Sequence, residues 1–287
     1  MKNFSFIIPV YNEEKAIEKV IELLKLEASN CENINEFEII IVDDNSTDKT
    51  FEILNKIKDI IIIKNLNNFG YGFSLKRGML NSNFENLVIL DGDGTYPIKH
   101  LDKLLNEFAK GYDLVIGKRT GKNLNLSLFK KPMRILLKFI VEYATGTKIP
   151  DINSGFRIIK KKEIVNKLKY LSNTFSFTTS MTMSFIYSRN TISYIDIPYD
   201  LREKGATSKV KIVQDSLRTL QYIIKIILKY DKIKLFVLLS AIQFFFSFFL
   251  YVISFYRPFY FTGATMLFIS AIITFCMGML SETNNNE

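Results

Sequence analysis

The sequence predicts an α/β fold: a mostly parallel, doubly wound sheet flanked by helices, then amphipathic helices and a two-helix membrane hairpin. Three observations predict it. Apolar strand-like runs alternate with helical stretches through the first 117 residues. Polar residues directly follow several of these apolar runs. Near the C-terminus, two stretches of 22 residues each carry no charge at all.

The leading part of the chain alternates strands and helices in order. Continuous Ile, Val and Leu runs bounded by helices indicate parallel strands that are buried on both faces. Apolar residues in helical spacing, preceded by capping residues, indicate the helices between them. The expected strands are residues 4–10, 37–42, 60–63, 87–90 and 113–116, and the expected helices are residues 14–27, 45–54 and 75–80.

After residue 117 the alternation stops. Residues 126–143 and 213–230 each predict a basic amphipathic helix, which either lies in the membrane interface or packs as an ordinary surface helix. Residues 235–256 and 259–280 would each span about 33 Å as a helix, enough for a hydrocarbon core of about 30 Å. The alternative is a helical hairpin buried in a soluble core. We expect a membrane hairpin.

The net charge of +9 is unevenly distributed. Residues 1–117 hold 13 Lys and Arg against 19 Asp and Glu, and residues 118–234 hold 24 against 8. The chain contains no recognisable nucleic-acid module, so this basic block predicts contact with an anionic membrane surface and argues against nucleic acid. The positive-inside rule places both ends of the hairpin in the cytoplasm.

Two further features agree with a cytoplasmic catalytic part. No cleavable signal precedes Phe4, so we expect the first 230 residues to stay on the side where they are made. Cys31 and Cys276 lie in different regions, and a disulfide between them is not expected.

Polar residues collect where the predicted strands end. In open α/β sheets, ligands bind beyond the carboxyl ends of the strands. These ends carry Tyr11-Asn12-Glu13, Asp43-Asp44, Asp91-Gly92-Asp93 and Gly117-Lys118-Arg119. The sequence therefore predicts a polar binding site along one rim of the sheet.

Asp91 and Asp93 are the most informative pair on this rim. Two residues apart in an extended segment, they point to the same side. Two carboxylates 4 Å apart repel by about 4 kcal/mol at an effective dielectric constant near 20, so either one takes a proton or a cation lies between them. Hard ions such as Mg²⁺ bind one or two carboxylates plus substrate phosphates, and Gly92 leaves room for a phosphate. Asp-x-Asp alone is common in turns, and its place on the rim is what indicates a metal.

Six segments together resemble a known family: FIIPVYNEE, IIIVDDNSTDKT, VILDGDGTYP, VIGKRTG, INSGFRIIKK and YDLREKGATSK. In this order they resemble the inverting GT-A glycosyltransferases of family 2. They are most similar to the branch of dolichol-phosphate-mannose synthase and the polyprenyl-phosphate sugar synthases. The resemblance implies a Rossmann-like GT-A domain whose first half, residues 1–117, binds a nucleotide sugar. Residues 118–212 would form the acceptor side, 213–232 an interface helix, 233–280 the hairpin and 281–287 a tail.

The resemblance also implies roles for individual residues. The nucleotide sugar would be bound by Pro9, Tyr11, Glu13, Val42, Asp44, Asp91, Gly92, Asp93 and Thr95. Asp91 and Asp93 would hold Mg²⁺ or Mn²⁺ on the diphosphate and, with Arg119 and Arg202, form the catalytic group. The acceptor phosphate would be bound by Arg119, Arg134, Arg202, Ser208 and Lys209. Arg134 could instead be a surface arginine whose charge reaches water, and Arg157, near the sugar site, could be structural.

The chain departs from the family pattern at two places. Thr95 stands where this branch often has a glutamine metal ligand, which leaves open whether Thr95 takes part in metal binding. Residues 175–181 contain no acid, whereas relatives that glycosylate hydroxyls carry an acidic pair there as the base. A phosphate acceptor is already ionised near neutral pH and needs no base, so this absence favours a lipid phosphate.

The sequence therefore predicts a membrane enzyme that moves a sugar, of the mannose or glucose type, from a GDP- or UDP-linked donor to a polyprenyl or dolichyl phosphate. One alternative is a family 2 transferase acting on a hydroxyl of a lipid-linked glycan or polymer. Another is a non-catalytic membrane scaffold, against which the intact Asp91, Asp93, Arg119 and Arg202 argue. The two membrane helices could support a homo-oligomer.

Overall fold

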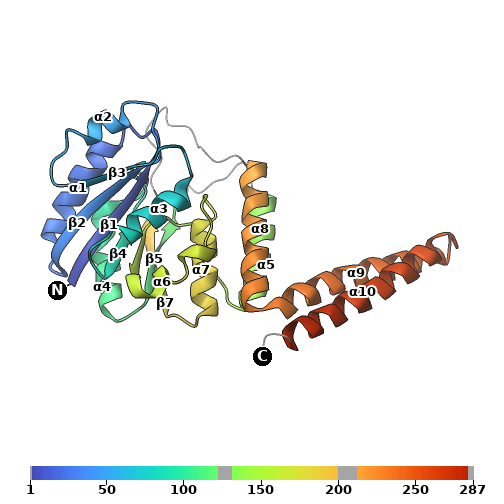
Figure 1. The fold of residues 1–287 in the computed structure, drawn as a ribbon. Helices are drawn as coiled ribbons and strands as arrows, with labels where there is room; N and C mark the ends of the chain where they lie inside the picture. Colours follow the sequence, from blue (N-terminus) through green and yellow to red (C-terminus); the bar gives the residue numbers. More distant parts are fainter. Residues whose placement is uncertain (1, 122–130, 200–211, 284–287) are drawn as a thin grey trace. The chain divides into compact units, whose positions relative to one another are not determined.

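The computed structural model describes residues 2–121, 131–199 and 212–283 (Figure 1). It divides into two compact units, Met1–Tyr222 and Ile223–Glu287. The first unit contains the sheet, and the second contains the two apolar helices.

The described part of the first unit is built on a seven-stranded sheet in the order β3-β2-β1-β4-β6-β5-β7 (Figure 1). Neighbouring strands run parallel, except that β6 is antiparallel to both β4 and β5. The mostly parallel sheet is confirmed. The strands are β1 (Lys2–Val10), β2 (Ile34–Asp43), β3 (Ile61–Lys64), β4 (Asn86–Ile89), β5 (Leu114–Thr120), β6 (Arg157–Lys160) and β7 (Ile192–Pro198).

The prediction that the alternation of strands and helices stops after residue 117 was wrong. β6 and β7 both lie beyond that residue and join the same sheet, and β5 itself runs across it to Thr120. The predicted donor and acceptor halves therefore share one sheet. The predicted helix 126–143 is seen from Lys131 to Thr145, and its first residues fall outside the described part.

Helices cover both faces of the sheet and enclose two apolar cores. Helices α1, α2 and α4 pack on one face, around Phe6, Leu24 and Phe108. Helices α3, α6 and α7 pack on the other, around Leu75 and Phe177. The helices of the first unit are α1 (Ile17–Asn30), α2 (Thr50–Leu54), α3 (Tyr71–Leu80), α4 (Leu101–Ala109), α5 (Lys131–Thr145), α6 (Lys161–Val165) and α7 (Phe177–Tyr187), and α8 (Ile212–Tyr230) crosses into the second.

The strand order reverses beside β1, and this point positions the site. From β1 the chain moves outward to β2 and β3 on one side, whereas β4 pairs with β1 on the other. In doubly wound sheets the crevice at such a switch point binds the ligand. Here β1 ends at Val10, just before Tyr11, and β4 ends at Ile89, two residues before Asp91.

The second unit is a hairpin of two helices, α9 (Lys232–Ser254) and α10 (Tyr260–Thr283), each long and apolar enough to cross a membrane. Ser247 Oγ donates to the Ala264 carbonyl at 2.7 Å. A Cβ at Gly278 would lie 2.6 Å from that of Phe236, so glycine permits the close approach.

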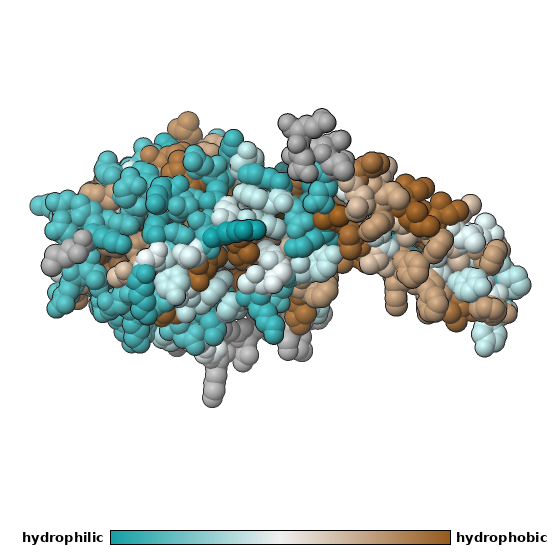
Figure 2. Space-filling model, turned by 90° about the horizontal axis from the view of Figure 1, so that it is seen from below, coloured by the Kyte–Doolittle hydropathy of each residue, from teal (hydrophilic) through white to brown (hydrophobic). Residues whose placement is uncertain are grey.

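The side chains of this hairpin argue against a buried soluble core. Phe245 is 65% exposed and Phe248 is 61% exposed, and Figure 2 shows hydrophobic side chains gathered over the hairpin. Such a large exposed apolar surface indicates contact with lipid or another protein.

Asp113 joins three strands at the end of the sheet opposite the site, and it makes stability depend on pH. Its carboxylate accepts hydrogen bonds from Lys160 Nζ at 2.8 Å and from the Thr191 backbone nitrogen at 2.9 Å. Burial raises the pKa of Asp113, but these bonds outweigh burial and lower the pKa to about 2. A depressed folded-state pKa gives stability that is present above the unfolded value of about 3.9 and is lost as the pH falls.

We therefore expect Asp113→Asn to flatten the pH dependence of stability between about pH 4 and pH 2. Urea unfolding of the full chain in detergent, measured across this range, tests the expectation. An unchanged slope would show that the Asp113 bonds do not persist in solution.

Candidate active site

The loops that follow β1 and β2 are tied together by hydrogen bonds, and this fixes their part of the rim. The Thr47 backbone nitrogen donates to Asn12 Oδ1 at 2.7 Å, and the Glu13 backbone nitrogen donates to Thr50 Oγ1 at 2.8 Å. Asn12 itself has a positive φ of 53°, a conformation that asparagine tolerates. Tyr11 and Glu13 are left half-buried at this edge, directly after β1.

Two predicted nucleotide contacts, Val42 and Asp44, are buried. Val42 is fully buried, with its side chain beneath Gly78 of α3. Asp44 is 4% exposed and accepts hydrogen bonds from Asn65 Nδ2 at 2.7 Å and from the Gly70 backbone nitrogen at 2.8 Å. Asp44 thus holds the segment that leads into α3, and its contact with a nucleotide stays a prediction.

Asp91 lies directly beyond β4 with its carboxylate in contact with two other segments. Tyr71 Oη, from the first turn of α3, donates to Asp91 Oδ1 at 2.8 Å. The Gly155 Cα also lies against the carboxylate, since a Cβ there would overlap both of its oxygens. Burial, followed by the charge of Asp91, raises the pKa of Tyr71 well above its usual range, so Tyr71 remains a donor.

Asp93 is 6% exposed, and Thr95 supports its carboxylate. Asp93 Oδ1 accepts from Thr95 Oγ1 at 2.6 Å and from the Thr95 backbone nitrogen at 3.1 Å. The threonine hydroxyl therefore acts here as a donor to a carboxylate, which orients Asp93.

These two carboxylates fit a hard divalent ion that is shared with phosphates. Among the described residues, no cluster of three or more His, Cys, Asp or Glu is suited to a metal. Mg²⁺ sites of this kind use one or two carboxylates and take further oxygens from substrate phosphates and water. The oxygen donors of Asp91 and Asp93, each oriented by a neighbouring hydroxyl, match that chemistry.

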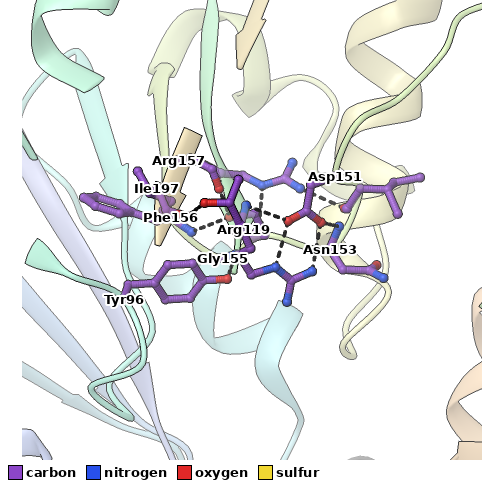
Figure 3. Close-up of polar contacts among 12 residues, drawn as sticks. Tyr96, Arg119, Asp151, Asn153, Gly155, Phe156, Arg157 and Ile197 are labelled. Carbon is purple, nitrogen blue, oxygen red and sulfur yellow. Dashed lines mark hydrogen bonds and ion pairs between the residues drawn. The ribbon is translucent and has the colours of Figure 1, made fainter. Parts of the chain in front are cut away.

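Arg119 forms a two-pronged ion pair with Asp151 at the end of β5 (Figure 3). Arg119 Nε and Nη2 donate to the two carboxylate oxygens at 2.7 and 2.8 Å, and the Arg119 backbone nitrogen also donates to Asp151. Burial by itself raises the pKa of Asp151, but the Arg119 guanidinium outweighs burial and lowers it. Asp151 is therefore a charged partner of Arg119 and a weak proton acceptor.

The turn from Ser154 to Arg157 lies beside Tyr96 (Figure 3), and its Gly155 lies against Asp91. The Gly155 backbone nitrogen donates to Tyr96 Oη at 2.7 Å. Arg157 is fully buried and donates to the carbonyls of Ser154 and Ile152 at 2.7 and 2.9 Å. Arg157 thus has the structural role that the sequence left open.

Arg134 lies on α5 and is half-buried. Burial, followed by the like charge of Arg119, lowers the pKa of Arg134. Two arginines beside one carboxylate leave an excess of positive charge that favours an anion. The other predicted phosphate contacts, Arg202, Ser208 and Lys209, lie outside the described residues.

The structure thus brings most of the described site residues to one rim and adds three that the sequence did not identify. These are Tyr71, Tyr96 and Asp151. Asp151 could have been noticed as a candidate site residue, because it begins the DINSGFR segment. Its pairing with Arg119 could not have been predicted from the sequence.

Gly155 offers a test of this geometry. We expect Gly155→Ala to push its Cβ into the Asp91 carboxylate, and a displacement of about 1 Å at a reacting centre can reduce turnover by about 10²-fold. Glycosyl transfer and thermal unfolding should be measured together. Gly263→Ala is a control, since its Cβ would meet only Leu250 at 3.8 Å. Equal turnover in the two variants would contradict the placement of Asp91.

The sequence is similar to known glycosyltransferases. The sequence matches glycosyl transferase family 2 over residues 5–168. It is 30% identical to undecaprenyl-phosphate 4-deoxy-4-formamido-L-arabinose transferase of Pectobacterium carotovorum, over 75% of this chain and 64% of that protein. It is 25% identical to an uncharacterized glycosyltransferase of Bacillus subtilis, over 76% of this chain and 68% of that protein.

Solved structures share the fold. Glucosyl-3-phosphoglycerate synthase from Mycobacterium tuberculosis, in complex with Mn²⁺ and UDP-glucose, superposes with a TM-score of 0.59 at 16% identity. The superposition covers 80% of this chain and 79% of the other. With a family match over more than half of its length, the chain belongs to glycosyl transferase family 2.

Proposed function

We propose that the chain transfers a sugar from a nucleoside diphosphate donor to a polyprenyl phosphate, with inversion, on the cytoplasmic face of a membrane. The observation that carries this proposal is the chemistry of the side chains around Arg119, which we call the Arg119 wall: Arg119, Arg134 and Asp151. It holds two arginines and a carboxylate, Asp151, whose pKa is depressed by its ion pair. The first turn of α7, which begins at Phe177, has no acidic residue.

This wall suits a phosphate nucleophile better than a hydroxyl. A hydroxyl acceptor loses its proton during the reaction and requires a base near the operating pH. Asp151 is a poor base because both of its oxygens accept hydrogen bonds from Arg119. A lipid phosphate is already anionic, and the excess positive charge of Arg119 and Arg134 would orient it. Arg202, Ser208 and Lys209 complete our assignment of the acceptor site.

On the donor side, we assign the diphosphate to the rim beyond β1 and β4. Asp91 and Asp93 would hold Mg²⁺ or Mn²⁺, which stabilises negative charge on a leaving diphosphate. Pro9, Tyr11, Glu13, Val42 and Asp44 would surround the nucleotide. Thr95 keeps the Asp93 carboxylate oriented through its hydroxyl. The acceptor would attack the sugar from the face opposite the diphosphate, which inverts the configuration.

The membrane assignment rests on amphipathic and apolar surfaces. Helix α5 exposes Ile135 and Phe139, each more than half exposed, beside basic side chains such as Lys138. The exposed apolar hairpin would span the bilayer, with the lysines before it on the cytoplasmic side. A substrate phosphate at the headgroup level would then reach the site without leaving the membrane.

The direct test offers two acceptors to the purified full chain. Radiolabelled UDP-glucose, GDP-mannose and a nucleotide-linked 4-deoxy-4-formamido-L-arabinose are each incubated with Mn²⁺ and either undecaprenyl phosphate or a lipid-linked glycan. We expect label in the lipid phosphate with one of the donors. Label only in the glycan would favour the hydroxyl-acceptor alternative. If the chain binds none of the donors, either with or without Mn²⁺, the result would favour a scaffold.

A further inference from the structure

Tyr71 is the residue outside the assigned machinery that most directly touches it. Its hydroxyl donates to Asp91 Oδ1 at 2.8 Å across 20 residues of chain. Tyr71 also begins α3, so its position depends on how that helix starts.

Two independent contacts fix the start of α3. The backbone nitrogen of Gly70, which precedes the helix with a φ of 101°, donates to Asp44 Oδ2 at 2.8 Å. One turn on, the backbone nitrogen of Phe73 donates to the Asn173 carbonyl at 2.9 Å. The helix start is thus held both by the end of β2 and by the segment before α7. Tyr71 lies between these two anchors.

The ring of Tyr71 is held as firmly as its backbone. It stacks on Phe175, with ring centroids 5.7 Å apart and an interplanar angle of 19°. A tyrosine has two main torsions, so a fixed backbone and a stacked ring leave its hydroxyl little freedom. Hydrogen bonds from a fixed neighbour orient metal ligands, and their loss reduces metal affinity or activity by about 10- to 100-fold.

We propose that Tyr71 is a positioning residue for the divalent ion, which fixes the rotamer of Asp91 through its hydrogen bond to Oδ1. The inference rests on the proposed function, because it takes Asp91 as a ligand of the ion that binds the donor diphosphate. It further implies that Asp44 acts on the metal site through the chain Asp44, Gly70, Tyr71 and Asp91. Tyr71 itself touches neither the nucleotide nor the acceptor.

The test compares Tyr71→Phe with the wild-type full chain by titrating Mn²⁺ and reading free Mn²⁺ by electron paramagnetic resonance, in the presence of UDP or of GDP. Phenylalanine keeps the stacking on Phe175 and removes only the hydroxyl. We expect the Mn²⁺ dissociation constant to rise by about 10- to 100-fold. We expect turnover to recover at saturating Mn²⁺. The same recovery is not expected for Asp91→Asn.

Tyr187→Phe is the matched control. It also removes a tyrosine hydroxyl that bonds within the fold, here to the Ala144 carbonyl at 2.9 Å, and it lies outside the site. We expect its Mn²⁺ affinity to equal that of the wild type, and both variants to have similar melting temperatures.

The outcomes separate the two proposals. If the wild type binds Mn²⁺ with a nucleotide and Tyr71→Phe binds it equally well, the role of Tyr71 is overturned and the proposed function stands. If Tyr71→Phe instead weakens UDP or GDP binding in EDTA, Tyr71 contacts the nucleotide directly, which also overturns positioning. If the wild type binds no Mn²⁺ with either nucleotide, the metal assignment fails, and the inference fails with it.

Discussion

Asp91→Asn should reduce sugar transfer by at least about 10²- to 10³-fold while the protein stays folded. The loss follows because asparagine has no negative charge for a divalent ion that balances the leaving diphosphate. The fold should persist because the asparagine Oδ1 can still accept the hydrogen bond from Tyr71. Turnover with labelled donor and undecaprenyl phosphate, together with the melting temperature, measures both effects.

A matched control removes an aspartate charge elsewhere. Asp102 lies in the first turn of α4 and is exposed. Asp102→Asn should leave transfer unchanged and cost about 0.3–1 kcal/mol at most, the usual value for an acidic residue near a helix start. Near-normal transfer by Asp91→Asn would count against the metal assignment.

Asp151→Asn should give the largest loss of stability in the first unit. It leaves the Arg119 guanidinium buried without its charged partner, and breaking a buried ion pair in this way typically costs about 3–5 kcal/mol. The side chains of Arg119 and Asp151 are only 13% and 10% exposed. Since the folded-state pKa of Asp151 is depressed, the pair stabilises above the ordinary carboxyl pKa of about 3.9 and weakens as the pH falls below it.

The free energies of unfolding of Asp151→Asn and Asp196→Asn, measured in urea, provide the comparison. Asp196 pairs with Lys118 at 3.0 Å, but its side chain is 65% exposed, so Asp196→Asn should cost about 0–1 kcal/mol. Replacing both Arg119 and Asp151 with leucine should recover much of the stability without recovering transfer. If Asp151→Asn and Asp196→Asn unfold alike, the Arg119 pair is not the buried contact that the structure shows.

The sequence was sufficient for the strands whose apolar runs are continuous. β1, β2 and β4 are buried on both faces and contain unbroken Ile, Val, Leu and Phe segments. β7 was missed because it is an edge strand, half-exposed, and mixes Ser193 and Asp196 with its apolar residues. β6 was missed because it is four residues long and runs directly into Lys161 of α6.

The site was predictable where its residues follow strands, and less so where it depends on partners distant in sequence. Asp91 and Asp93 follow a buried strand, so their placement on the rim could be inferred. The partner of Arg119 lies 32 residues away, and the tyrosine that bonds Gly155 lies 59 residues away. The periodicity of apolar residues predicts helices and strands, but it does not predict which distant side chains form hydrogen bonds. They depend on how β5, β6 and the turn before β6 pack together.

The most direct test of the account is to locate a metal ion in the protein. Crystals of the full chain grown with Mn²⁺ and UDP, or with Mn²⁺ and GDP, would give anomalous scattering at the manganese edge. The account predicts one strong anomalous peak for a manganese ion that is coordinated by carboxylate oxygens of Asp91 and Asp93 and by oxygens of the diphosphate. Tyr71 should still donate its hydrogen bond to Asp91. A diphosphate bound with both aspartates turned away from the ion would contradict it.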